Sequence, residues 1–225
     1  MANYIYIISG LGADERVFQR VNFGGYTPVF LQYIPAIKGE SIAQYAQRLL
    51  PQITTPNPIL VGISFGGIIA IELSKLIPTR GLVLLATAKT RAEIPFYFRM
   101  LGRLQLHRLL SPRLMKSRFH LKGTYKVFGI SETEDKAILH QILEDTDPAF
   151  LKWAINAIVH WNNKTLPTHY YHLHGEKDRI FPKQFVAATD WVAADGHSLP
   201  LTSAEKVSRW MVEKLNQITA DEVEV

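Results

Sequence analysis

Apolar runs alternate with amphipathic stretches along this chain of 225 residues. Short, mostly apolar runs indicate strands that are buried on both faces, as in a parallel sheet. Between several of these runs, apolar residues recur every three or four positions, which is the spacing of a helix with one buried face. The pattern predicts strands at 4–8, 28–34, 58–63, 81–87, 168–175 and 188–196.

Helix start signals stand between several of the predicted strands. Ser41 precedes a helical pattern as an N-cap residue. Asp147 and Pro148 form a second start, with proline at the first helical position. Ser131, with Glu134 three residues later, has the form of a capping box. Because strands and helices alternate in this way, the sequence predicts a doubly wound α/β sheet, mostly parallel.

One long segment interrupts the alternation. From about residue 91 to residue 161 the spacing is helical and no strand pattern occurs. We therefore expect residues 1–90 and 162–225 to form the core, and residues 91–161 to form an inserted helical cap. Such an insertion is either a second small domain or a lid over a site at the edge of the sheet.

The stretch LVGISFGGIIAIEL places a serine between glycines where a predicted strand becomes a helix. A sharp turn of this kind exposes the hydroxyl of Ser64 and needs small residues two positions away, here Gly62 and Gly66. The backbone N–H of Phe65 then points into the same space, where it can donate to an oxyanion. The plain alternative is a tight turn with an incidental serine.

A nucleophilic serine needs a base, and the base needs a carboxylate that orients it. At a strand–turn–helix site the three follow in the order serine, acid, histidine. Asp178 lies just after a predicted strand, in HLHGEKDRIFP, and His197 lies in the later loop AADGHSLP. Asp178 alone could be a solvated turn residue, and His197 alone could be a loop histidine. Together and in this order with Ser64, they predict a Ser-His-Asp triad.

The loop ISGLGAD, after the first predicted strand, is the candidate for the second oxyanion donor. The backbone N–H of Leu11 is the predicted donor, because Gly10 and Gly12 let the chain approach a substrate closely. Gly10 and Gly12 also match the first two glycines of the G-x-G-x-x-G pattern that binds dinucleotides. However, Glu15 occupies the position of its third glycine, and no acidic residue stands about 20 residues further on.

Three motifs together give the chain a resemblance to the α/β-hydrolase family. GISFGG resembles the nucleophile elbow of that family, HGEKDRIFP its acid loop and DGHS its histidine loop. The resemblance covers about residues 4–95 and 168–215 and implies an α/β-hydrolase fold with a helical cap inserted after a central strand. One difference is that Ser9 stands where many members carry a histidine before Gly10. The donor at this loop is a backbone group, so the difference concerns only how the loop is braced.

Composition restricts the cofactors and partners. The chain has no cysteine, which excludes disulfides and fits a reducing, cytoplasmic location. His172 and His174 have a spacing that metals can use, but no third ligand accompanies them, so we expect hydrogen-bonded strand histidines rather than a metal site. No apolar run is long enough for stable membrane insertion, and no aromatic-basic pattern supports a nucleic-acid partner. No cofactor is expected.

Basic residues are concentrated in the first half of the predicted cap. Residues 89–126 hold ten Lys or Arg and one acid, Glu93, although the whole chain has a net charge of only +5. The plain interpretation is a solvated helix face. The alternative is a lid that attracts anions, either an acidic substrate or an anionic membrane surface, with Arg99, Arg103 and Arg108 as possible contacts to a substrate.

The combined prediction is a serine hydrolase that cleaves a small carboxylic ester or a related acyl compound. Its partner would be that small-molecule substrate. Two alternatives stay open: a lyase of the same fold that acts on a carboxylated metabolite, and a non-catalytic binding protein.

Overall fold

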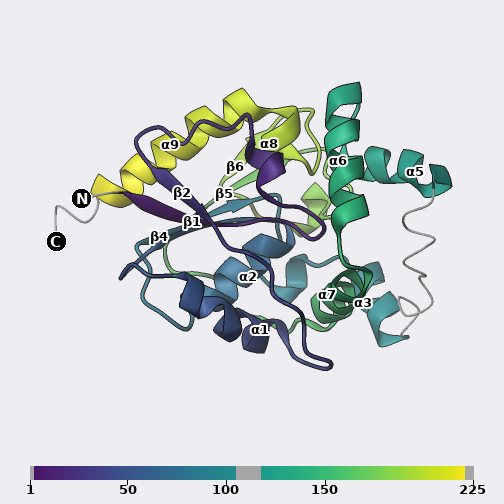
Figure 1. Ribbon diagram of the computed structural model, residues 1–225, viewed down its shortest axis with the longest axis horizontal. Coiled ribbons are helices and arrows are strands. Elements are labelled where there is room, and N and C mark those ends of the chain that lie inside the picture. Colours follow the sequence, from purple (N-terminus) through teal and green to yellow (C-terminus); the bar gives the residue numbers. More distant parts are fainter. Residues whose placement is uncertain (1–2, 105–117, 221–225) are drawn as a thin grey trace.

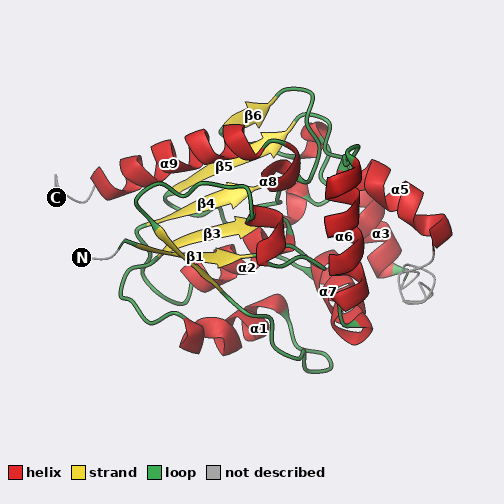
Figure 2. Ribbon diagram, turned by 45° about the horizontal axis from the view of Figure 1, so that its top comes forward, coloured by secondary structure: helices red, strands yellow, loops and turns green. Residues whose placement is uncertain are grey.

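A six-stranded sheet in the order β2-β1-β3-β4-β5-β6 forms the centre of the molecule (Figures 1 and 2). The computed structural model describes residues 3–104 and 118–220. All five neighbouring strand pairs in this sheet are parallel. The strands are β1 (Tyr4–Ile8), β2 (Thr27–Phe30), β3 (Ile59–Ile63), β4 (Gly81–Leu85), β5 (Tyr170–Gly175) and β6 (Asp190–Val192).

The direction of strand addition reverses between β1 and β3. The chain adds β2 on one side of β1 and then returns to add β3 and all later strands on the other side. In open α/β sheets the crevice for a ligand lies at the carboxyl ends of the strands at such a reversal. The loop after β1 and the turn after β3 therefore lie on either side of the expected site.

Side chains from the strands fill two hydrophobic cores, one on each face of the sheet. Tyr6 and Leu60 belong to the first core, and Ile7 and Val61, their neighbours along the chain, belong to the second. This alternation is the period of two that a strand imposes. The long apolar runs of the sequence thus arise because both faces of the sheet are covered.

Helices cover both faces and the carboxyl end of the sheet (Figure 1). Residues of α1, α2 and α7 contribute to the first core, and residues of α6, α8 and α9 contribute to the second. None of the helices in the described part of the chain combines the length and the apolar character that a membrane span requires. The helices are α1 (Ile42–Leu49), α2 (Phe65–Ser74), α3 (Phe96–Arg103), α5 (Arg118–Phe128), α6 (Thr133–Asp145), α7 (Pro148–His160), α8 (Leu199–Thr202) and α9 (Ala204–Ala220).

Four of these helices, α3, α5, α6 and α7, lie between β4 and β5 in the chain. Figure 2 shows them together at one end of the sheet, beyond the tips of the strands. Phe150 and Ala154 of α7 belong to the first core, and Leu139 and Ile142 of α6 belong to the second. The helices of this segment therefore share the cores of the sheet.

The predicted start of one helix is wrong. Instead of capping it, the Ser131 hydroxyl donates to the carboxylate of Glu132, and α6 begins two residues later, at Thr133. The starts predicted at the two other helices are confirmed: Ser41 accepts from the backbone of Gln44, and Asp147 accepts from the N–H of Ala149.

Strand β2 is shorter than its apolar run, which extends to residue 34. It ends at Phe30 because its neighbour β1 ends at Ile8, so the chain beyond has no strand to pair with. The hydroxyl of Tyr45 accepts from the N–H of Ile34 and donates to its carbonyl. It thus replaces hydrogen bonds that a neighbouring strand would have made. Side-chain contacts of this kind are not visible in the apolar pattern.

Candidate active site

The turn from β3 into α2 holds Ser64 in a strained backbone conformation. Its φ of 54° and ψ of −121° lie where L-residues with side chains rarely occur. The Ser64 N–H donates to the carbonyl of Leu85, and its own carbonyl accepts from the Thr87 hydroxyl and from the N–H of Gly67. These three contacts hold the turn, and the Ser64 side chain stays partly exposed.

Glycines surround Ser64 because a larger residue would collide with backbone. A Cβ on Gly66 would lie 2.1 Å from the carbonyl oxygen of Ile8, and a Cβ on Gly62 would lie 2.6 Å from that of Gly66. The next glycine, Gly67, leaves room for Thr87. The need for small residues on both sides of the serine, predicted from the sequence, therefore has a steric basis in the packing of α2 against β1 and β3.

Three side chains from separate loops meet in one hydrogen-bonded row. The Ser64 Oγ lies 2.8 Å from His197 Nε2, and His197 Nδ1 lies 2.7 Å from Asp178 Oδ2. Asp178 follows β5, and His197 lies in the loop that joins β6 to α8. Both are buried, with 3% and 2% of their surface exposed. The three residues that the motif order predicts thus lie together in the arrangement of a nucleophile, a base and an orienting acid.

Asp178 is held as a carboxylate by donors on both of its oxygens. Oδ1 accepts from the backbone N–H groups of Ile180 and Phe181. Oδ2 faces His197 Nδ1 and, at 3.3 Å, His174 Nε2. Burial alone would raise the pKa of Asp178. The charges and hydrogen bonds of His197 and His174 outweigh burial and hold this pKa well below its ordinary value of 3.8.

The loop after β1 passes directly beside the serine. A Cβ on Gly10 would lie 3.4 Å from the Cβ of Ser64. The N–H of Leu11 makes no hydrogen bond within the described part of the chain. Phe65, as the first residue of α2, has no acceptor for its N–H within the helix. Neither of these two amides, the predicted oxyanion donors, therefore has an acceptor within the described part of the chain.

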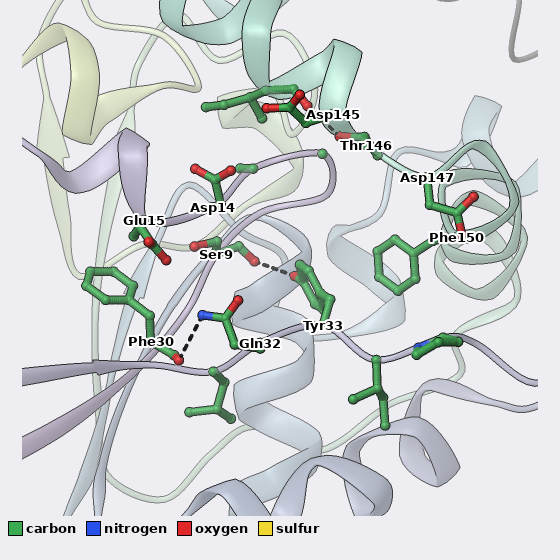
Figure 3. A pocket seen from close by; sticks show the side chains of 16 residues that line it. Ser9, Asp14, Glu15, Phe30, Gln32, Tyr33, Asp145, Thr146, Asp147 and Phe150 are labelled. Carbon is green, nitrogen blue, oxygen red and sulfur yellow. Dashed lines mark hydrogen bonds between the residues drawn. The ribbon is translucent and has the colours of Figure 1, made fainter.

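A tyrosine braces this loop, a role that the sequence pattern does not reveal. The hydroxyl of Tyr33 donates to the carbonyl of Ser9 (Figure 3). Its ring stacks on Phe65 and lies 4.8 Å from the ring of Phe150. Tyr33 thus braces the loop two residues before Leu11 and contacts the ring of Phe65, the other candidate donor.

A cavity of about 310 Å³ opens beside Tyr33, and Figure 3 shows its lining. It lies between the loop after β1, the chain after β2 and the junction of α6 with α7. Ser9 and Gly12 form part of its wall, whereas Ser64 is not among the described residues that line it. The geometry around Ser64, rather than this cavity, defines the candidate site.

The predicted arginine contacts have a different setting. Arg99 and Arg103 line a second cavity, of about 530 Å³, together with Arg91 and His160. Ser64 is not among the described residues that line this cavity. The Nε of Arg99 is buried and has no hydrogen-bond partner among the described residues. Arg108 lies outside the described residues.

The two strand histidines, His172 and His174, are buried and hydrogen-bonded. His172 Nδ1 lies 3.1 Å from Lys89 Nζ, and His174 Nε2 lies 2.8 Å from the carbonyl oxygen of Phe181. Across residues 3–104 and 118–220, no group of three or more His, Cys, Asp or Glu side chains could hold a metal ion. Sequence spacing placed the two histidines on one strand face but did not connect them to Asp178.

His172 should make the stability of the fold depend on pH. Burial, and then the charges of Lys89 and His174, lower its pKa well below the ordinary 6.5, and Asp178 opposes this shift. The folded ring therefore stays neutral where the unfolded one takes up a proton. Because the unfolded state binds more protons below about pH 6.5, the free energy of unfolding falls as the pH falls, by up to about 1.4 kcal/mol per pH unit.

The measurement is urea unfolding at several pH values from about 7.5 to about 5. We expect a flatter pH dependence in His172→Gln than in the wild type. His169→Gln is the matched control, because His169 is only partly buried and bonds a carbonyl at the other end of β5. Equal slopes in His172→Gln and the wild type would contradict the prediction.

Comparisons with known proteins agree with this geometry. Residues 12–210 match the family model described as "Alpha/beta hydrolase family". A putative lipase from Acinetobacter baumannii has a similar structure, with a TM-score of 0.73 at 16% identity, over 98% of this chain and 85% of that one. MenH from S. aureus gives 0.74 at 14% identity, over 97% and 96%.

An esterase from Exiguobacterium antarcticum gives a TM-score of 0.68 at 17% identity, over 96% of this chain and 93% of that one. A search of curated protein sequences finds no match. At these identities the structural likeness establishes the fold, and the family match extends over most of the chain.

Proposed function

Because the chain belongs to the alpha/beta hydrolase family, we propose that it is a serine hydrolase that cleaves a small carboxylic ester or a related acyl compound. The single observation that carries the proposal is the row of hydrogen bonds from Ser64 through His197 to Asp178. A serine is a weak nucleophile unless a base lies within hydrogen-bond reach, and the contacts of His197 with Ser64 and Asp178 support this role.

In the proposed reaction the Ser64 Oγ attacks the carbonyl carbon of the ester while its proton passes to His197 Nε2. Asp178 accepts from His197 Nδ1 and stabilises the imidazolium that forms. The N–H groups of Leu11 and Phe65 donate to the oxyanion of the tetrahedral intermediate. His197 then protonates the leaving alcohol. Water, activated by the same histidine, releases the carboxylic acid from Ser64 and restores the enzyme.

A fluorophosphonate probe combined with a panel of small esters tests this function. We expect the probe to label the peptide that contains Ser64, and at least one ester to be hydrolysed at the same site. Labelling without turnover of any ester would favour the lyase, which would move protons with the same three residues. Absence of labelling would favour a binding protein and overturn the proposal.

We also propose that the basic residues of α3 favour anionic substrates. Arg99 and Arg103 lie near Arg91 around one cavity, and no carboxylate lines it in the described part of the chain. The field of charges that solvent can reach is screened beyond about 10 Å at 0.1 M salt. Their effect on a substrate should therefore be small and should weaken as salt is added.

The test compares a neutral ester with a matched ester that bears a carboxylate, across a salt series. We expect Arg99→Gln/Arg103→Gln to lower kcat/KM for the anionic ester by roughly 2- to 20-fold at low salt and to leave the neutral ester unchanged. Arg209→Gln, at an exposed position of α9, is the matched control. The same salt response for both esters would contradict the proposal and show that these arginines only form a solvated helix face.

A further inference from the structure

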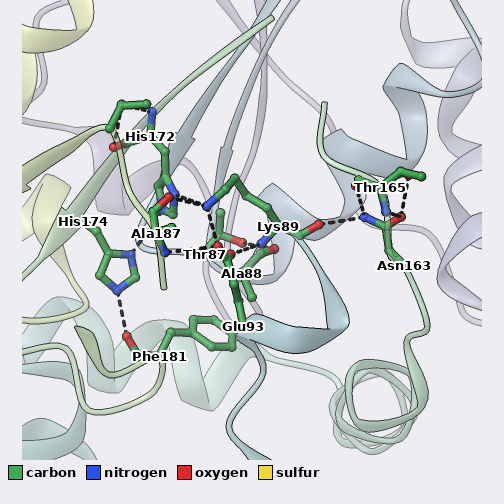
Figure 4. Close-up of polar contacts among 11 residues, drawn as sticks. Thr87, Ala88, Lys89, Glu93, Asn163, Thr165, His172, His174, Phe181 and Ala187 are labelled. Atoms are coloured by element: carbon green, nitrogen blue, oxygen red, sulfur yellow. Dashed lines mark hydrogen bonds and ion pairs between the residues drawn. The ribbon is translucent and has the colours of Figure 1, made fainter. Parts of the chain in front are cut away.

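Behind the candidate acid lie four buried polar side chains that the proposed reaction does not use. They are Lys89, Glu93, His172 and His174, each with less than a tenth of its surface exposed. Lys89 and Glu93 follow β4, and the two histidines lie on β5 (Figure 4). Burial of polar groups is costly unless they are hydrogen-bonded, so each contact in this cluster determines where its protons lie.

Lys89 begins the cluster as an ammonium group. Its Nζ lies 2.7 Å from Glu93 Oε1, 2.8 Å from the carbonyl oxygen of Ala187 and 3.1 Å from His172 Nδ1. Three acceptors match the three N–H donors of a charged lysine. Burial lowers the pKa of Lys89, but the charge and hydrogen bond of Glu93 oppose this. Glu93 is itself held by the backbone N–H groups of Lys89 and Ala187.

The carbonyl of Phe181 determines the tautomers of both histidines. A carbonyl oxygen only accepts, so His174 Nε2, at 2.8 Å from it, must carry a proton. In a neutral ring, His174 Nδ1 is then an acceptor, and it lies 3.2 Å from His172 Nε2. His172 Nε2 therefore carries a proton and His172 Nδ1 accepts from Lys89. The hydrogen bonds run in one direction, from the ammonium toward Asp178.

The last donor in this row reaches the acid itself. The Nε2–H of His174 donates to the Phe181 carbonyl, and Asp178 Oδ2 lies 3.3 Å from the same nitrogen, close enough for this N–H to attract the carboxylate. That oxygen is the one bonded to His197. Oδ1 of Asp178 accepts from two backbone N–H groups, and one side of Oδ2 faces His174. The orientation of the carboxylate toward His197 is therefore fixed. Hydrogen bonds arranged in series polarise one another, most strongly where water is excluded.

We propose that Lys89, His172 and His174 are positioning residues that act through Asp178: they form a directed row of hydrogen bonds that keeps the carboxylate ionised and aimed at His197. This proposal rests on the proposed function only for its kinetic consequence. The direction of the row is a property of the folded chain, and it can be measured without turnover. The alternative is that the cluster only joins β4 to β5.

Nitrogen NMR of the protein labelled in its histidine rings tests the direction of the row. We expect His172 and His174 each to carry the ring proton on Nε2 rather than on Nδ1, with assignments from His172→Gln and His174→Gln. In Lys89→Met/Glu93→Gln, which removes both members of the ion pair and leaves no lone buried charge, the His172 signal should shift toward a mixture of tautomers. A proton on Nδ1 of either ring in the wild type would overturn the proposal, whether or not the protein hydrolyses esters.

Kinetics test the action on Asp178. We expect His174→Leu to lower kcat by roughly 10- to 100-fold, the loss typical of one hydrogen bond to a charged group, with KM little changed. His174→Gln keeps an N–H near the position of Nε2 and should recover most of this loss. His169→Gln should behave as the wild type. Rates are divided by the fraction of sites that a fluorophosphonate probe titrates, so that unfolded molecules do not count.

The kinetic outcomes separate the two proposals. If His174→Leu retains the kcat of the wild type per titrated site, the cluster only joins the strands and the positioning role is overturned. If Leu and Gln at position 174 lower kcat equally, the missing donor is not the cause and the proposal also fails. If the wild type hydrolyses no ester, the proposed function fails, while the NMR result still decides the direction of the row.

Discussion

Ser64→Ala and His197→Ala should each lower kcat on a hydrolysed ester by roughly 10⁶-fold, the loss seen when either member of a triad is removed. The Ser64 Oγ is the proposed nucleophile, and its proposed base, His197 Nε2, lies 2.8 Å away. Because neither residue works without the other, the double variant should be little worse than either single one. If the free-energy losses of the two single variants added up in the double variant, the two residues would not act as a unit.

The matched control for this experiment is Ser203→Ala, the same change in the turn that joins α8 to α9. It should leave kcat within about twofold of the wild type, as expected for a substitution outside the site. Alanine at position 64 meets the same backbone strain as serine there, so the folded structure should survive. Activity of Ser64→Ala near that of the wild type would end the serine-hydrolase proposal.

The parts of the fold and site that could be predicted from sequence depend on local patterns. The strand before Ser64, the helix after it and the glycines around it all lie within a few residues of one another. Asp178 and His197 are distant from Ser64, yet each follows a strand, and parallel strands bring their carboxyl ends to one edge. Motif order therefore sufficed to select side chains that the fold brings into one hydrogen-bonded row with Ser64.

Other parts of the site depend on which strands become neighbours and on register. His172 meets Lys89 because β4 lies beside β5, with His172 opposite Leu84. Tyr33 reaches Ser9 because β2 lies beside β1 and the two residues follow the paired ends of these strands. Neither contact leaves a periodic signal in the sequence. The helix start predicted at Ser131 is wrong for a local reason, because its hydroxyl donates to the adjacent Glu132 instead of capping α6.

Asp178→Asn should lower kcat by about 10⁴-fold, because the asparagine presents an N–H donor to His197 where the carboxylate presents an acceptor. In the wild type Oδ1 accepts from the backbone N–H groups of Ile180 and Phe181. The amide oxygen of the asparagine takes that place, and its NH₂ then occupies the position of Oδ2. There it faces two nitrogens, His197 Nδ1 at 2.7 Å and His174 Nε2 at 3.3 Å.

His197 can satisfy that NH₂ only by accepting at Nδ1, and this moves its own proton to Nε2. A ring protonated at Nε2 cannot take the proton of Ser64, so the base is lost while the fold is kept. Two measurements check this: kcat per titrated site, and the tautomer of His197 by nitrogen NMR. Asp195→Asn is the matched control, because Asp195 stands two residues before His197 and bonds Gly196 and Thr202 instead of the ring. A mild loss in Asp178→Asn, with the His197 proton still on Nδ1, would show that another group orients the base.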